Sequence, residues 1–101
     1  MDVAIKMIER WARQNQIFNA ISELESTTTQ NLYNYLKTTD KHITTKVIDS
    51  SLRHYKKNGY LKRGTIRPYS YRLTNKGLKQ LEWLEDGEHL EYIEMREIIN
   101  G

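Results

Sequence analysis

The sequence has no cysteine, one proline and five glycines among its 101 residues. The absence of cysteine excludes disulfides, thiolate zinc sites and cysteine nucleophiles. Few prolines and glycines favour regular secondary structure over long loops. The longest apolar run is three residues, at positions 3–5, so we expect neither a transmembrane helix nor a signal peptide. These features predict one globular, cytoplasmic domain with no membrane partner.

Positive charge is concentrated in the middle of the chain, although the net charge is only +3. Residues 1–34 carry a net charge of −1, residues 35–79 carry +10 and residues 80–101 carry −6. A local basic surface attracts a polyanion whatever the total charge of the protein. The charge pattern therefore favours a nucleic-acid partner for the middle segment.

The spacing of apolar residues predicts helices in the first half of the chain. An apolar stripe over residues 3–24 pauses at 13–16, which predicts either one long helix or two helices meeting near Asn15. The threonines of the 26–29 stretch favour caps, and a second helix is expected from Gln30 to Lys37. A turn at 38–42 precedes a third helix, capped by Thr44 or Thr45 and ending near Lys57.

The third helix has the clearest pattern. Ile48, Leu52 and Tyr55 form its apolar face, and Ile43 precedes the cap as a hydrophobic staple. Asn58-Gly59 supplies the stop, because glycine adopts the left-handed conformation without a Cβ penalty.

Two short extended runs follow, at 60–63 and 69–74, joined by a hairpin loop at 64–68. Thr74 or Asn75 caps a last helix with leucines at 78, 81 and 84. Beyond a polar break at 85–89, a further helical stripe is expected.

The order helix, helix, helix, hairpin, helix is that of a helix-turn-helix followed by a wing. Residues 43–61 (ITTKVIDSSLRHYKKNGYL) resemble the recognition helix and first wing strand of winged helix-turn-helix regulators. Residues 71–77 (YRLTNKG) resemble the second wing strand running into the last helix. The resemblance, strongest to MarR-type and PadR-type regulators and to small archaeal virus or plasmid winged-helix proteins, covers about residues 17–84.

The resemblance implies a mostly α fold with a small β-hairpin (α+β class). We expect a single winged-helix domain with a helical extension at 1–16, a core at 17–84 and a C-terminal dimerisation helix at 85–101. It also implies sequence-selective binding of double-stranded DNA, as a homodimeric transcription regulator. The recognition helix would enter the major groove, and the wing would lie on the backbone or in the minor groove.

Short polar and long basic side chains mark the candidate DNA-binding surface. Opposite the apolar face of the third helix, short polar groups allow close approach to base edges, and basic groups reach phosphates or guanine. The second helix contributes two further candidates at its start. The predicted DNA-binding residues are Gln30, Tyr33, Thr45, Lys46, Asp49, Ser50, Arg53, Lys57, Lys62, Arg63, Arg67 and Arg72.

Several alternatives stay open for this surface. Asp49 could accept from cytosine, but an intrahelical pair with Arg53 is favoured. The basic side chains could be ordinary solvated groups, and Tyr33 could simply pack. A protein–protein interaction module without specific DNA binding is the main alternative function. Binding of single strands or RNA would require exposure of Tyr69 and Tyr71.

Apolar residues in the terminal regions exceed the need of a three-helix core. We expect a dimer contact there, whereas the alternative is that these helices fold back on their own core. The predicted interface residues are Trp11, Trp83, Leu84, Leu90, Ile93 and Ile98.

No pattern predicts catalysis. The three histidines at 42, 54 and 89 are far apart and lack ligands at metal-binding spacing. The acidic residues of the C-terminal region match the polar face of a helix better than a metal site. We therefore expect no enzyme activity, metal or cofactor, and the sequence does not identify a small-molecule effector.

Overall fold

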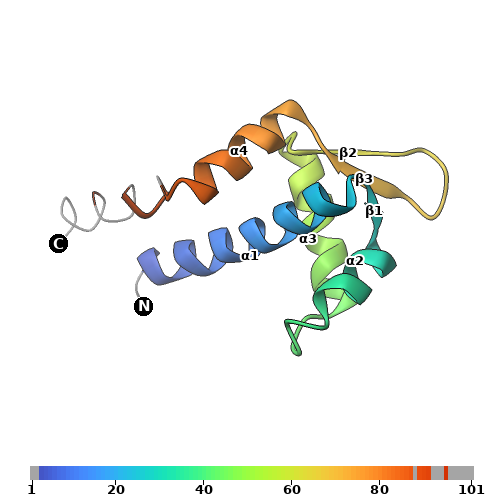
Figure 1. The fold of residues 1–101 in the computed structure, drawn as a ribbon, viewed down its shortest axis with the longest axis horizontal. Coiled ribbons are helices and arrows are strands. Elements are labelled where there is room, and N and C mark those ends of the chain that lie inside the picture. Colours follow the sequence, from blue (N-terminus) through green and yellow to red (C-terminus); the bar gives the residue numbers. More distant parts are fainter. Residues whose placement is uncertain (1–2, 88, 92–94, 96–101) are drawn as a thin grey trace.

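The computed structural model describes residues 3–87, 89–91 and 95. The elements are α1 (Val3–Leu24), β1 (Thr27–Thr28), α2 (Thr29–Leu36), α3 (Thr45–Lys57), β2 (Leu61–Arg63), β3 (Ser70–Leu73) and α4 (Asn75–Glu85). Figure 1 shows α1 and α4 running side by side at one end of the molecule and the β2–β3 hairpin projecting at the other. Within the described ranges, no helix has the length and apolarity needed to cross a bilayer.

The α1 helix is continuous, which decides between the two arrangements that the sequence left open near Asn15. The polar residues that interrupt its apolar stripe have partners. Gln14 is buried, and its Oε1 accepts a hydrogen bond of 2.7 Å from Nε2 of Gln80 in α4. Asn19 donates to Asn15 one turn earlier. Because these groups are satisfied, no break in the helix is required.

The predicted boundaries of α3 are confirmed. Thr44 is the N-cap and its hydroxyl accepts from the Val47 amide at 3.2 Å. Ile43 directly precedes this cap and Ile48 is the fourth residue of the helix, and both are buried, which is the arrangement of a hydrophobic staple. At the other end Gly59 has φ +83°, the left-handed conformation that ends a helix.

The sheet has three strands in the order β1–β3–β2, all antiparallel, rather than the hairpin alone. The strand missed from sequence is β1, whose Thr27 pairs with Tyr71 and is 3% exposed. Thr28 both pairs with Ser70 and caps α2 by accepting from the Asn31 amide. The threonines of this stretch therefore act as strand residues as well as caps.

The hydrophobic core lies between α1, α2, α3 and the inner face of the sheet. Ile17, Phe18 and Ile21 of α1 are fully buried at its centre. The Phe18 ring meets the Tyr55 ring edge to face, with centroids 5.1 Å apart. The predicted apolar face of α3 is confirmed, because Ile48, Leu52 and Tyr55 all belong to this core. These contacts fix α3 with its opposite face outward.

The Leu-Thr-Asn-Lys-Gly segment at 73–77 ties the start of α4 to the end of α3. The Thr74 hydroxyl accepts from the Gly77 amide at 3.1 Å and donates to the Gly59 carbonyl at 2.6 Å. Lys76 Nζ donates to the Asn58 carbonyl at 2.7 Å. A Cβ on Gly77 would stand 2.2 Å from the Tyr60 carbonyl oxygen, so only glycine fits here.

Three of the predicted dimer residues pack within the chain. Leu84 is 2% exposed in the α1–α4 region, so the expectation that it faces a partner is corrected. Trp11 and Trp83 meet edge to face at 5.1 Å, with the His89 ring 5.7 and 5.6 Å from them. Leu90 is 48% exposed. The predicted interface residues Ile93 and Ile98 lie outside the described residues.

Candidate nucleic-acid interface

The outward face of α3 carries the predicted polar and basic side chains together. Because Ile48, Leu52 and Tyr55 point into the core, the opposite side of the helix faces solvent. The exposed members of this face are Thr45, Lys46, Ser50, Arg53 and Lys57. Basic side chains in the last turn also suit the negative end of the helix dipole. The face can present hydroxyls near the helix start and cations further along.

Asp49 organises this face from its edge. One carboxylate oxygen forms an ion pair with the guanidinium of Arg53, which confirms the predicted intrahelical pair. The other oxygen accepts a long hydrogen bond of 3.5 Å from the hydroxyl of Thr29 at the start of α2. Asp49 therefore links α2 to Arg53, and its ion pair with Arg53 offsets the charge of the carboxylate.

A groove of about 560 Å³ separates the starts of α2 and α3 from the base of the wing. Gln30 and Asp49 line it, as predicted members of the site. Thr45 also lines it and belongs to the predicted set. The remaining lining residues, which the predicted set does not contain, are Thr28, Thr29, Asn31, Pro68, Tyr69 and Tyr71. Thr28 and Asn31 form an N-cap pair, the signal that could have indicated them.

Tyr33 has a different environment from Gln30. Its ring packs partly against the hydrophobic core, and Lys37 Nζ lies 5.5 Å from the ring centroid. It does not belong to the lining of the groove. The packing alternative for Tyr33 is therefore the one that these contacts support.

Tyr69, which lines the groove, lies against two arginines of the wing. The guanidinium carbon of Arg63 lies 4.2 Å from the ring centroid and that of Arg67 lies 5.4 Å away. Arg67 Nε also donates to the Tyr69 hydroxyl at 3.2 Å. Tyr71, by contrast, is 3% exposed. The two tyrosines therefore do not form the exposed aromatic pair that single-strand binding would require.

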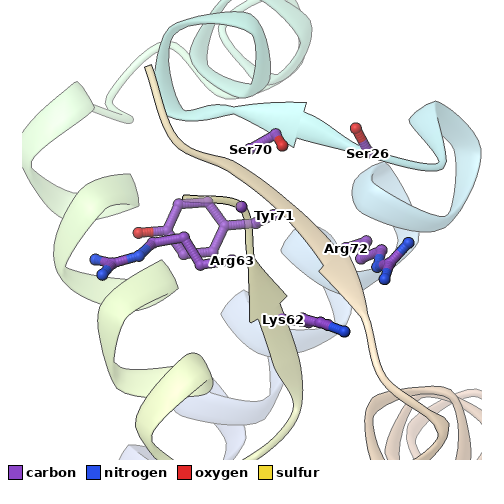
Figure 2. Close-up of a pocket in the computed structure, with 7 residues that line it drawn as sticks. Ser26, Lys62, Arg63, Ser70, Tyr71 and Arg72 are labelled. Atoms are coloured by element: carbon purple, nitrogen blue, oxygen red, sulfur yellow. The ribbon is translucent and has the colours of Figure 1, made fainter. Parts of the chain in front are cut away.

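The pleat of the sheet divides the basic residues of the wing into two sets. Lys62 is directly opposite Arg72, and Arg63 is directly opposite Tyr71. Figure 2 shows Arg63 and Tyr71 directed toward α3, and Lys62 and Arg72 directed to the other side of the sheet. The pleat thus directs Arg63 to the side opposite Lys62 and Arg72, although all three border one hollow of about 300 Å³ at the edge of the sheet.

The turn between α2 and α3 is anchored to α1 through Asp40. Its carboxylate accepts from Arg13 at 3.1 Å and from Gln16 at 3.3 Å, and its other oxygen accepts from the His42 amide at 3.2 Å. These hydrogen bonds, that of Gln16 first, hold the pKa of Asp40 below its usual value. The anchor ties the turn between α2 and α3 to α1.

No histidine contributes to a metal site in the described part of the chain, where no three histidine or acidic side chains converge. His42 and His54 are exposed, and His54 contacts the side chain of Asn58 at 3.1 Å. The candidate interface consists of hydroxyl, amide and cationic groups together with the paired carboxylate of Asp49.

Comparison with known proteins gives the fold. No protein-family model matches the sequence, and no curated protein matches it. Three solved structures are similar. The structure of the hsRosR-S4 complex has a TM-score of 0.65 at 17% identity, covering 88% of this chain and 87% of that one. The YusO protein from Bacillus subtilis has a TM-score of 0.66 at 10% identity, covering 97% and 70%. A MarR family protein from Bacillus stearothermophilus has a TM-score of 0.58 at 17% identity, covering 97% and 70%. The chain therefore has the winged helix-turn-helix fold, mostly helical with a small antiparallel sheet.

Proposed function

We propose that this protein is a transcription regulator that binds double-stranded DNA selectively, with α3 in the major groove. The observation that carries the proposal is the outward face of α3, where Lys46, Ser50, Arg53 and Lys57 are exposed around one internally paired carboxylate. Short hydroxyl groups let a helix approach base edges, and arginine can pair with guanine. The wing arginines beside the groove extend the same cationic surface toward the backbone or minor groove.

Selection of bound duplexes from a random pool tests the proposal directly. The wild-type protein should enrich one motif, and Arg53→Ala should lose affinity and change the preferred base at one position. A bidentate arginine contact discriminates by about 1–3 kcal/mol. Arg10→Ala, which removes an exposed arginine from α1, is the matched control and should leave the motif unchanged. Enrichment of no motif would refute selective binding.

Salt dependence separates this function from a protein-interaction module. If about five basic side chains per protomer contact phosphates, a dimer makes about ten contacts, and the log–log slope approaches about −9. A shallow slope together with a tightly bound protein partner would instead support the interaction module.

We also propose that the protein acts as a homodimer through its terminal helices. Large apolar side chains remain exposed in the described part of this region, namely Ile8 at 44%, Leu90 at 48% and Met95 at 61%. A second copy could cover them, since two-fold pairing needs one self-complementary patch. Two copies of α3 would then enter successive major grooves about 34 Å apart.

Sedimentation at micromolar concentration tests the dimer. The intact chain should sediment as a dimer without DNA. A chain ending at Asp86 should remain folded, sediment mainly as a monomer and bind an operator much more weakly, because each half-site then binds independently. A monomeric intact chain would contradict the proposal.

A further inference from the structure

Ile66 lies at the tip of the loop that joins β2 to β3, and its side chain is largely exposed to solvent. Its exposed fraction of 82% is the highest among the exposed large apolar side chains of the described residues. Figure 1 shows that this loop projects from the body of the molecule. Ile66 therefore packs little within the chain, and a binding partner that covered it would gain from removing apolar surface from water.

The arginine head groups beside the tip are engaged with an aromatic ring. Arg67 donates from Nε to the Tyr69 hydroxyl at 3.2 Å, and its guanidinium carbon lies 5.4 Å from the centroid of the Tyr69 ring. The guanidinium carbon of Arg63 lies 4.2 Å from the same centroid. Tyr69 in turn lines the groove beside the starts of α2 and α3. These contacts hold both arginines at Tyr69 and leave the apolar Ile66 side chain at the tip of the wing.

The charge around the tip favours nucleic acid, rather than another protein, as the partner that covers Ile66. Residues 50–81 contain no Asp or Glu, and the strands that flank the loop carry Lys62, Arg63 and Arg72. A cationic surface of this kind attracts a polyanion. In the minor groove of DNA, sugars form apolar walls beside the phosphates, and proteins insert isoleucine and other apolar side chains there. The minor groove therefore offers phosphates to the cations and an apolar surface to Ile66.

We propose that Ile66 is a specificity-determining residue that enters the minor groove and selects A·T pairs over G·C pairs. The inference rests on the proposed function and adds a base-selecting role for an uncharged residue of the wing. A G·C pair places the N2 amino group of guanine in the minor groove, whereas an A·T pair presents only the adenine N3 and thymine O2 acceptors. Isoleucine has no acceptor for that amino group, and its branched side chain would occupy the same space. The selection therefore comes from fit against the base pair and not from the positive charge of the wing.

Duplexes that differ only in the pairs flanking the motif enriched from the random pool test this role. The flanking pairs are all A·T, all G·C or all I·C, because inosine lacks the N2 amino group but keeps the major-groove pattern of guanine. The wild type should bind the G·C duplex about tenfold more weakly than the A·T duplex, and should bind the I·C duplex like the A·T duplex. Pairs of 2,6-diaminopurine with thymine, which add the amino group to an A·T pair, should weaken binding by a similar factor.

Ile66→Ala should bind the A·T, I·C and G·C duplexes with similar affinity. Its log–log slope against salt should equal that of the wild type, because the variant removes no charge. The matched control is Leu78→Ala, which removes an apolar side chain that is 49% exposed on α4 and should keep the tenfold preference. Ile66→Ala should also melt at the wild-type temperature, because substitutions at such exposed positions have little effect on stability.

Four outcomes contradict the inference or the function beneath it. Retention of the A·T preference by Ile66→Ala, with or without its loss in Arg67→Ala, would overturn the inference and leave the proposed function intact. Binding of the I·C duplex as weakly as the G·C duplex would also overturn it, because the amino group would then not be what is read. Altered sedimentation of Ile66→Ala with unchanged DNA binding would assign the tip to a protein contact instead. Absence of any duplex binding by the wild type would refute the proposed function, and the inference with it.

Discussion

Replacing Gly77 by alanine should test the contact that joins the end of α3, the start of the hairpin and α4. The added Cβ would lie 2.2 Å from the Tyr60 carbonyl oxygen, and real Cβ atoms essentially never approach within 3.0 Å. Either α4 or the backbone at Tyr60 must therefore move by roughly 0.8 Å, because interiors are closely packed and give little. The obstacle is a backbone atom, so no side-chain rotation can relieve it.

The magnitude follows from the hydrogen bonds that such a shift would weaken. Thr74 N–H donates to Tyr60 at 3.0 Å, the Thr74 hydroxyl donates to Gly59 at 2.6 Å, and Lys76 donates to Asn58 at 2.7 Å. At about 1 kcal/mol each, their loss costs about 3 kcal/mol. Alanine regains about 1 kcal/mol of helix propensity. The net loss of unfolding free energy should be about 2 kcal/mol, which lowers the melting temperature by about 8–16 °C.

Urea unfolding followed by far-ultraviolet circular dichroism measures this loss. The matched control is Asn75→Ala, an exposed position in the first turn of the same helix, which should stay within about 0.5 kcal/mol of the wild type. If helix propensity alone decided the outcome, Gly77→Ala would be more stable than the wild type. That result would refute the close approach of α4 to Tyr60.

Further predictions concern three residues, namely Asp40, Tyr69 and Trp83. Asp40→Asn should lower the melting temperature at neutral pH, and the difference from the wild type should vanish as the pH falls through the lowered pKa of Asp40. The reason is that a carboxylate with a depressed pKa stabilises the fold above its unfolded pKa and loses this effect on protonation. Thermal melts from pH 7 to pH 2 check this. Tyr69→Phe should weaken DNA binding by about threefold through loss of the Arg67 hydrogen bond. Tyr69→Leu should weaken it by about tenfold because both cation–π contacts disappear, with anisotropy as the assay and unchanged melting as the control. Trp83→Ala should lose about 2 kcal/mol of stability at every protein concentration, since its ring packs within the chain; a loss seen only at dimer-forming concentrations would contradict that packing.

The helices were predictable because their signals are local. The N-cap threonines at 44 and 74 lie within three residues of the amides that they cap, so the sequence could place each cap to within one residue. The β1 strand was not predictable in the same way. Its partner Tyr71 is more than forty residues away in the chain, and a two-residue strand has no periodicity to detect.

The basic residues of the wing could be listed from the sequence, but the face of the sheet to which each belongs could not be fully assigned. Alternation along β3 indicated that Ser70 and Arg72 share a face, yet the pairing register decides that Lys62 joins them and that Arg63 does not. The cluster of Arg63 and Arg67 on Tyr69 depends on side-chain stacking across the wing, for which a single sequence carries no signal.

The acidic residue on α3 is best understood through its effect on the arginine beside it. A free arginine side chain loses about 2 kcal/mol of rotamer entropy when a ligand fixes it, so prior orientation reduces the loss on binding. Asp49 holds Arg53 and is itself joined to Thr29 of α2. The negative charge of Asp49 weakens the attraction of this face of α3 to phosphates, while the ion pair holds the Arg53 side chain in position on the helix face. In the proposed complex, Asp49 would therefore exchange non-specific affinity for a defined arginine position, and base selection depends on such a position.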